Sequence, residues 1–267
     1  MNPFIARADS RGFTLVELLV AIALSGIVLG TMVGAMTAQG RSAAYQQGLA
    51  DAQLTSRGIG ELFQQDLRMA GFGMLGVSPA DDVPPLEYSV QGDREIVTLR
   101  GAYSNVQTNL RQGALAGSTT LVVEPPAAGS FSTGEMVLVD SGMNSEIRTI
   151  TGTATVAGEL TLNLDAPLAA QYPVGPNVTQ LDVIVWELDG SMLTRNGAVI
   201  ADNAQNFDLQ YIDNLGVITD QPGEDLRAVL VDLRTAQPTR LPDNPEASSR
   251  LDTEVNVRNL AFRFSLG

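Results

Sequence analysis

The chain of 267 residues contains no cysteine, no histidine and no lysine. It therefore cannot use Ser-His-Asp or Cys-His catalysis, a Schiff-base lysine, the lysine of a P-loop, or a zinc site built on cysteine or histidine. Thirty acidic residues against sixteen basic ones give a net charge of −14, which argues against direct binding of nucleic acid. We predict no catalytic residues, no metal site and no cofactor.

The most informative segment is an apolar run from Phe13 to Met36, in which Glu17 is the only charged side chain. At about 1.5 Å per residue, a helix over this run is about 36 Å long and can cross a bilayer core of about 30 Å. Arg7 and Arg11 precede the run, and positive charge beside an apolar segment favours a cytoplasmic location for that end. We expect a membrane helix with the rest of the chain on the far side.

Three kinds of segment share these features: a secretory signal peptide, a plain membrane anchor and a prepilin-type signal. A secretory signal has an apolar region of about 7–15 residues, which is shorter than this run, although Val33-Gly34-Ala35 would serve as a cleavage site. A plain anchor fits the length but leaves Glu17 unexplained, because a carboxylate at the centre of a membrane costs about 2.5–3.5 kcal/mol.

The stretch Gly12-Phe13-Thr14-Leu15-Val16-Glu17 lies behind Arg11 and ahead of the apolar run. It resembles the prepilin signal of type IV pilins and type II secretion pseudopilins. The resemblance implies that a prepilin peptidase cuts between Gly12 and Phe13, that the new Phe13 amine is methylated, and that Glu17 neutralises the Phe13 amine of a neighbouring subunit. Pairing would offset the cost of burying each charge alone. The alternative is that Glu17 lies at the membrane interface and contacts water.

Gly26, Gly30 and Gly34 recur on one face of this helix. Small residues at this spacing let two helices approach closely, so we predict a helix-packing face, although glycine is common in membrane helices in general.

A second, polar half of the helix is expected over residues 37–71, with Gly71 as its C-terminal cap. Its apolar positions follow a helical period and predict one stripe that faces a core: Tyr45, Leu49, Ala52, Ile59, Phe63, Leu67 and Ala70. The stretch from Leu62 to Phe72 is similar to the helix end of PilW-type minor pilins. Asp66 and Arg68 do not face each other on a helix, so we expect them to dock the helix to the sheet.

Beyond Gly71 the period changes to two, which indicates an all-β body. The expected strands are Leu86–Gln91, Glu95–Arg100, Thr119–Glu124, Glu135–Asp140, Glu146–Thr151, Glu159–Leu164, Val178–Leu188, Phe207–Tyr211, Leu226–Arg234 and Val255–Leu266. Asp189-Gly190 and Asn196-Gly197 predict two hairpin turns, and we expect a meander.

The predicted fold is α+β and pilin-like: a long N-terminal α-helix with a hydrophobic first half, packed on an antiparallel β-sheet with an inserted small β-rich domain. The expected divisions are a leader over 1–12, a membrane and filament-core helix over 13–36, an amphipathic helix over 37–71, the β domain over 72–112 and 179–267, and the insert over 113–178. The insert is set apart by its small residues and its paired prolines.

Two oxygen-rich loops have ligand types suitable for Ca²⁺. One contains Asp140, Asn144 and Glu146, and the other contains Asp213, Asn214, Asp220, Glu224 and Asp225. Neither has the spacing of a known calcium loop, and such residues are common in turns, so we interpret both as turns.

The resemblance implies a minor pilin that is processed by prepilin peptidase and takes part in type IV pilus assembly, in a priming or tip complex. Its implied partners are other minor pilins, the major pilin, the inner membrane and the assembly platform. It would be held in the inner membrane with a periplasmic body before it enters the pilus. The alternatives are a type II secretion pseudopilin of the J type and a pilus-borne adhesin.

Overall fold

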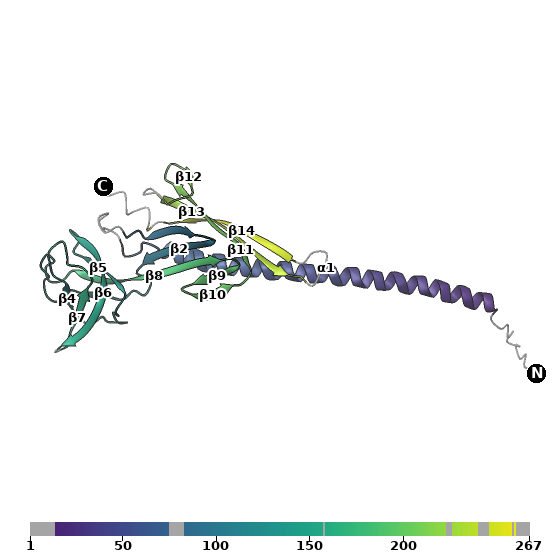
Figure 1. Ribbon diagram of the computed structural model, residues 1–267, viewed down its shortest axis with the longest axis horizontal. Coiled ribbons are helices and arrows are strands. Elements are labelled where there is room, and N and C mark those ends of the chain that lie inside the picture. Colours follow the sequence, from purple (N-terminus) through teal and green to yellow (C-terminus); the bar gives the residue numbers. More distant parts are fainter. Residues whose placement is uncertain are drawn as a thin grey trace, which may run out of the picture.

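The computed structural model describes residues 14–74, 83–156, 158–222, 226–239, 246–257 and 259. One long helix, α1 (Leu15–Met69), projects from a β-rich body. Its N-terminal half extends away from the body, and a small β module lies at the opposite end of the molecule (Figure 1). The expected α+β class, with one long N-terminal helix and antiparallel sheets, is confirmed.

The helix begins and ends at residues whose chemistry explains the boundaries. Thr14 has extended backbone geometry and caps the first turn. At the other end Gly71 has a φ of 77°, a left-handed conformation that glycine adopts at low cost. The apolar stripe of the polar half is confirmed, because its later positions face the body and are buried: Ala52, Ile59, Phe63, Leu67 and Ala70.

In the described part of the chain, fourteen strands follow the helix: β1 (Leu86–Gln91), β2 (Arg94–Gly101), β3 (Gln107–Asn109), β4 (Thr120–Val123), β5 (Met136–Asp140), β6 (Ser145–Val156), β7 (Glu159–Leu164), β8 (Asn177–Asp189), β9 (Met192–Arg195), β10 (Ala198–Ala201), β11 (Ala204–Asp213), β12 (Ile218–Thr219), β13 (Leu226–Pro238) and β14 (Glu246–Asn256). They form two antiparallel sheets within the described chain. The larger has the order β1-β2-β8-β5-β6-β7-β4, with β3 and β9 also paired to β8 and β10 paired to β9, and the smaller has the order β12-β11-β13-β14.

Both predicted hairpin turns are confirmed. Gly190 has a φ of 62° in the turn between β8 and β9, and Asn196 and Gly197 have φ values of 50° and 76° between β9 and β10. Two consecutive residues with positive φ match the twist of the flanking strands.

The expected meander is wrong in the larger sheet. β2 pairs with β8 over its whole length, and five strands intervene between them in the sequence. The chain leaves the sheet after β2, builds the small β module that contains β4, β5, β6 and β7 (called the distal module below; Figure 1), and returns through β8. Periodicity cannot reveal this arrangement, because it fixes which face of a strand is buried and not which strand lies beside it.

The main core lies between α1 and the two sheets. At its centre Phe63 of α1 packs edge-on against Trp186 of β8 and Phe207 of β11, with ring centroids 5.4 and 4.9 Å apart. Edge-to-face contacts of this kind add to the stabilisation from buried area. One aromatic side chain of the helix therefore joins both sheets.

A second core fills the distal module and is separate from the first. It includes Leu121, Ile150 and Leu162, and it extends back to Val106 and Leu110. The predicted insert begins at 113, whereas the residues of this core begin at Val106. At its other end the module shares β8 with the main body, since β8 pairs with β5 near its start and with β2 farther along.

The last strand lies mostly earlier than the range predicted from Val255 to Leu266. β14 begins at Glu246, and only its final residues, Val255 and Asn256, fall in the predicted range. Residues 258 and 260–267 lie outside the described part of the chain. The early part of β14 was missed because it is a polar edge strand with exposed Ser248, Arg250 and Asp252, and such a strand lacks a strong apolar alternation.

Candidate functional site

The start of α1 holds the carboxylate that the sequence singled out. Glu17 Oε2 accepts hydrogen bonds from the backbone N–H and the hydroxyl of Thr14, each at 3.0 Å, and the Glu17 N–H donates to Thr14 Oγ1 at 3.3 Å. This is a capping box, in which two residues satisfy each other's free groups at a helix N-terminus. Glu17 therefore has a partner within its own chain.

Sequence reasoning missed the role of Thr14, although the signal was available, since a threonine three residues before a glutamate at the start of an apolar run is typical of a capping box. The predicted cleavage and methylation residues, Gly12 and Phe13, lie outside the described residues.

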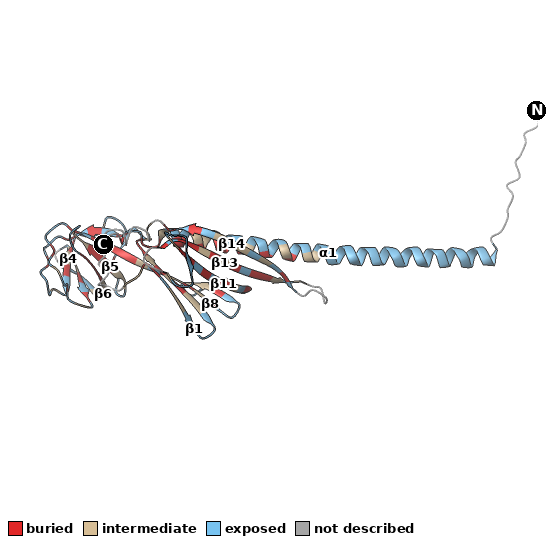
Figure 2. Cartoon of the chain, turned by 90° about the horizontal axis from the view of Figure 1, so that it is seen from above, coloured by how far each residue is buried: buried red, intermediate tan, exposed pale blue. Residues whose placement is uncertain are grey.

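The body leaves the N-terminal half of α1 uncovered. All described side chains from Leu15 to Met36 are exposed (Figure 2). By length and composition α1 can cross a membrane, and its most apolar window is 0% buried by the rest of the chain. At Gly26, Gly30 and Gly34 an added Cβ would meet no atom within 4 Å, so nothing inside one subunit requires glycine there. Their predicted role in packing against another helix remains a prediction.

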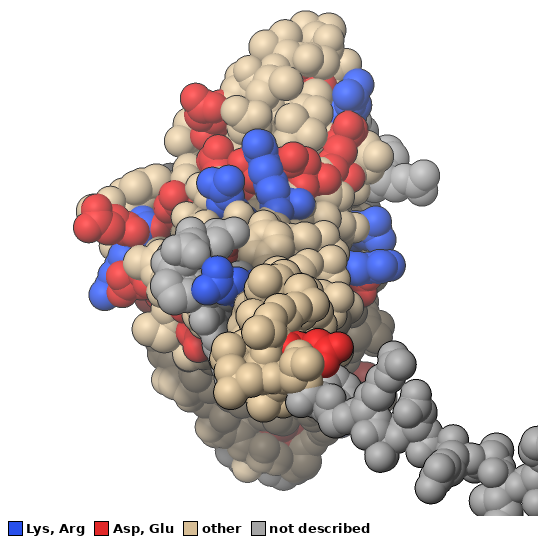
Figure 3. Space-filling model, turned by 90° about the vertical axis from the view of Figure 1, so that its right-hand side faces the viewer, with Lys and Arg blue, Asp and Glu red and all other residues tan. Residues whose placement is uncertain are grey.

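The β body carries many charged side chains of both signs, unlike the apolar N-terminal half of α1. Seen from the side of the helix N-terminus, acidic and basic side chains lie next to one another on the body (Figure 3). Within the body, Arg250 donates to Asp232 at 3.0 Å and to Asp252 at 3.1 Å. These hydrogen bonds and the nearby carboxylates raise the pKa of Arg250. The apolar helix end and the charged body are thus two distinct surfaces.

A buried charge cluster fixes the polar half of α1 to the larger sheet. Asp66 is 4% exposed. Its carboxylate accepts Nε and Nη2 of Arg195 at 2.7 and 2.9 Å and the indole N–H of Trp186 at 2.8 Å. Its backbone carbonyl accepts the hydroxyl of Tyr103 at 2.8 Å. The hydrogen bond to Asp66 raises the pKa of Arg195, and burial raises that of Tyr103.

The expectation that Asp66 docks the helix is confirmed by these contacts. Arg68 behaves differently, because its guanidinium donates to Gln64 on the same helix at 3.4 Å, while its backbone carbonyl accepts from Asn259 at 2.8 Å. Sequence reasoning missed Arg195 and Trp186, which lie 129 and 120 residues from Asp66 in the chain.

The two oxygen-rich loops contain hydrogen bonds typical of turns. Asp140 Oδ1 accepts the Gly142 N–H at 2.8 Å, and Asp213 Oδ1 accepts the N–H groups of Leu215 and Val217. Among the described residues no group of three or more acidic side chains could hold a metal ion. Glu224 and Asp225 lie outside the described residues.

Glu146, assigned above to the first loop, points into the distal module. Its carboxylate accepts the N–H groups of Ala169 and Ala170 at 2.8 and 2.7 Å and the hydroxyl of Tyr172 at 3.1 Å, and it pairs with Arg148. It is 6% exposed. A buried carboxylate with this many donors is a structural group that fixes a loop.

Comparison with known proteins identifies the N-terminal region only. The sequence model of one family, the prokaryotic N-terminal methylation motif, matches residues 7–33. Neither the curated proteins nor the solved structures contain a significant match to the chain. The matched segment includes the predicted cleavage site and Glu17, and it overlaps the uncovered half of α1. The motif and the long apolar helix support a type IV pilin-like protein, a pilin or pseudopilin of the prepilin type, and are consistent with a single-pass membrane anchor.

Proposed function

We propose that this protein is a minor pilin, of the PilW type, that takes part in assembly of a type IV pilus as part of a priming or tip complex. The observation that carries the proposal is the uncovered apolar half of α1 with Glu17 in its first turn. An apolar surface of this size needs either lipid or other helices around it. The role requires no catalytic residue and no cofactor.

In this proposal Glu17 changes partner during assembly. In the membrane, Thr14 satisfies one oxygen of the carboxylate and so lowers the cost of its burial. In the filament, the methylated amine of Phe13 on a neighbouring subunit supplies the opposite charge. Because a charge pair stabilises only when its geometry is good, this contact also fixes the axial position of one helix against the next.

The remaining partners follow from the same role. Prepilin peptidase removes the leader on the cytoplasmic side of the inner membrane, the body lies in the periplasm, and an assembly platform passes the subunit to other minor pilins and the major pilin. The distal module lies at the end of the molecule opposite the helix N-terminus (Figure 1). This position favours a second candidate function, a pilus-borne adhesin, with the module exposed at the filament tip.

The proposal is tested with Glu17→Ala in a strain that has its own prepilin peptidase. We expect the variant to be cleaved before Phe13 and inserted in the membrane as the wild type is, but to enter sheared pili at a level reduced about tenfold, because a charge contact worth about 1.4 kcal/mol is lost. Mass spectrometry gives the N-terminus, and immunoblotting of the pilus fraction gives the level.

Glu61→Ala is the matched control, since it removes an exposed carboxylate from the polar half of the same helix. Wild-type amounts of the Glu17 variant in pili would remove Glu17 from the mechanism. A mature chain that begins at Met1 or Met36 would contradict the pilin role itself. Recovery of the protein with a type II secretion complex instead of pili would identify it as a pseudopilin.

A further inference from the structure

The turn between β11 and β12 presents apolar side chains to solvent. Leu215 is 86% exposed, and Val217 and Ile218 are each 53% exposed. Hydrogen bonds hold the turn in shape, because the Asp213 carboxylate accepts the N–H groups of Leu215 and Val217 at 2.9 and 2.8 Å, and the Asp213 N–H donates to the Val217 carbonyl at 3.1 Å. We call residues 215–218 the apolar turn. Since its shape is fixed in the free chain, binding through it costs little ordering.

The position of the apolar turn indicates what kind of partner covers it. Single exposed apolar residues are normal on a protein surface, whereas a contiguous group of them marks an interaction site. β12 lies beside the β body, away from the uncovered N-terminal half of α1 (Figure 1). A membrane that holds α1 therefore does not reach this turn, and the surface fits another protein.

A recess of about 530 Å³ in the distal module has matching properties. None of the residues that line it is charged, and they include Leu115 and Met143, which are 71% and 93% exposed. The lining also includes the buried residues Ala114 and Tyr172, whose backbones exchange two hydrogen bonds at 2.9 and 2.7 Å. Pockets of about 300–1,000 Å³ with mainly apolar linings are typical binding sites, so this recess can accept side chains of the apolar turn.

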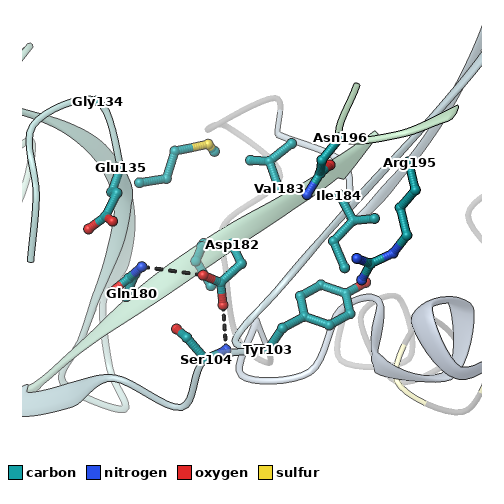
Figure 4. Close-up of a pocket in the computed structure, with 12 residues that line it drawn as sticks. Tyr103, Ser104, Gly134, Glu135, Gln180, Asp182, Val183, Ile184, Arg195 and Asn196 are labelled. Carbon is teal, nitrogen blue, oxygen red and sulfur yellow. Dashed lines mark hydrogen bonds between the residues drawn. The ribbon is translucent and has the colours of Figure 1, made fainter. Parts of the chain in front are cut away.

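Other recesses of the described chain match the apolar turn less well, because they carry charge. The recess beside β8 contains Glu135 and Asp182 (Figure 4). The recess over the smaller sheet contains Asp232, and the one along α1 contains Glu61. An apolar side chain that covered these carboxylates would remove their water without offering a hydrogen bond. The uncharged recess of the distal module is therefore the better match.

Two copies are needed to bring the two surfaces together. Within one copy, β12 lies beside the main body, whereas the distal module lies at the end of the molecule (Figure 1). Two copies that are anchored in one membrane through α1 point in the same direction. When one of them is displaced along the long axis, its apolar turn comes level with the recess of the other. The contact joins unlike surfaces, so each copy keeps one surface free and the contact can repeat as a row.

We propose that the apolar turn of one copy inserts into the recess of the distal module of a second copy, with Leu215 between Leu115 and Met143. The contact links the β bodies of neighbouring copies that point the same way. It adds a contact between bodies to the helix packing proposed above, and it does not rest on the role of Glu17.

Cross-linking tests this contact cleanly, because the chain has no cysteine of its own. Full-length Asn214→Cys, in the turn, and full-length Gln171→Cys, at the recess, are purified separately in detergent, mixed in equal amounts and treated with a short bis-maleimide. Both positions are exposed. We expect the mixture to give at least about tenfold more cross-linked dimer than either variant alone. Asn214→Cys mixed with Gln91→Cys, an exposed position on β1, controls for chance contacts between copies held together by α1.

The leucine of the turn has its own test. Leu215→Asp, made in the Asn214→Cys chain, should reduce the cross-link about tenfold, because its carboxylate would be buried in the recess without a partner. Val217→Asp should have the same effect. Val199→Asp is the matched control, since Val199 is a 57% exposed valine on β10, outside the turn, and it should leave the cross-link unchanged. The fluorescence of Trp186 checks that each variant is folded.

Equal cross-linking of the test and control mixtures, or an unaffected Leu215→Asp variant, would overturn the proposal. Dimers as abundant from one variant alone as from the mixture would overturn the pairing of unlike surfaces. Glu17→Ala should leave the cross-link unchanged, so failure of this contact and failure of the pilus role are separate results.

Discussion

Asp66 shows how one residue can determine where a helix docks. Its carboxylate binds Arg195 and Trp186 at the same time, and both partners come from the larger sheet. Salt bridges at the surface contribute little to stability, but removal of one member of a buried pair leaves the other charge without compensation. Asp66 therefore matters for the position of α1 more than any exposed ion pair of the body.

Asp66→Asn should lower the free energy of unfolding by about 2–4 kcal/mol, because Arg195 would keep its charge in a half-buried place without an opposite charge. Chemical denaturation of the detergent-solubilised protein measures this change, followed by the fluorescence of Trp186, the only tryptophan. Asp232→Asn is the control, since it affects the more exposed pair with Arg250 and should cost at most about 1 kcal/mol. Equal losses in the two variants would contradict this interpretation of Asp66.

Glu95 is a carboxylate that destabilises the folded chain at neutral pH. Its Oε2 atom is buried with no hydrogen-bond partner among the described residues, and burial, with a smaller effect from Asp208, raises its pKa above the ordinary value of 4.5. Because the folded state binds this proton more tightly than the unfolded state, stability falls as the pH rises through this region and stays lower at pH 7.

Glu95→Gln should therefore raise the free energy of unfolding at pH 7, and this gain should disappear below about pH 4, where both states of the wild type are protonated. Denaturation curves at several pH values give the difference. Glu87→Gln, which removes a surface pair with Arg100, should show the opposite sign at pH 7. A gain at Glu95 that did not depend on pH would mean that charge is not its cause.

At the scale of elements, α1 and β14 pack closely at Gly60, where the helix has no side chain. A Cβ added at Gly60 would lie 2.3 Å from Leu251 Cδ2, whereas one added at Gly48 would lie 3.4 Å from Ala247 Cβ, close to an ordinary contact distance. From the sequence, the glycines in the polar half of α1 are only a cost to helix stability. The structure gives Gly60 a packing reason that helix propensity cannot reveal.

Gly58 and Gly60 form a matched pair on one helix. Gly58→Ala should raise the free energy of unfolding by about 0.5–1 kcal/mol, because an added Cβ meets no atom within 4 Å there. Gly60→Ala should lower it by about 1–2 kcal/mol, because Leu251 must move. The same denaturation experiment compares them, and a gain at both positions would show that β14 adapts to the added methyl group.

The sequence predicted where helices and strands lie along the chain better than it predicted which of them lie side by side in the fold. Periodicity located the buried stripe of α1 and most strands, and glycine identified the helix end at Gly71 and the turns at Gly190 and Gly197. Neither signal predicted that β2 lies beside β8, or that Arg195 reaches Asp66, because these contacts join residues that are far apart in the chain. At the start of α1, Glu17 was visible as an isolated charge, while its partner Thr14 was overlooked.

At the scale of the whole molecule, the main core and the distal core share no residue, but a third buried cluster packs Met74, which follows the helix, against Leu138, Ile147 and Leu181. The main core contains none of residues 105–181, and the chain closes this excursion where the Ser104 N–H donates to the Asp182 carboxylate. Removal of the module at that point leaves the main core closed but uncovers Met74, which packs against the module.

Replacement of residues 105–181 by a short glycine linker should leave the main body folded, with the fluorescence of Trp186 retained. The free energy of unfolding should fall by about 1–3 kcal/mol, because Met74 loses its packing against Leu138, Ile147 and Leu181, while loop closure depends weakly on length. Removal of residues 113–178 alone should cause aggregation, because it exposes Val106 and Leu110, which then have no core to enter. Trp186 fluorescence and size-exclusion chromatography distinguish the two deletions. Similar behaviour of both would show that the module supports the body.

The continuity of β8 has a mechanical consequence. β8 begins at the distal core, where it contributes Val178, and near its other end it carries Trp186, which packs against Phe63 of α1 and donates a hydrogen bond to Asp66. Tension applied to the tip of the molecule along its length would travel down this strand to the helix without meeting a hinge. The hydrogen bonds between β8 and β2 would then be loaded together, in shear, so the body would resist extension as a unit rather than open strand by strand.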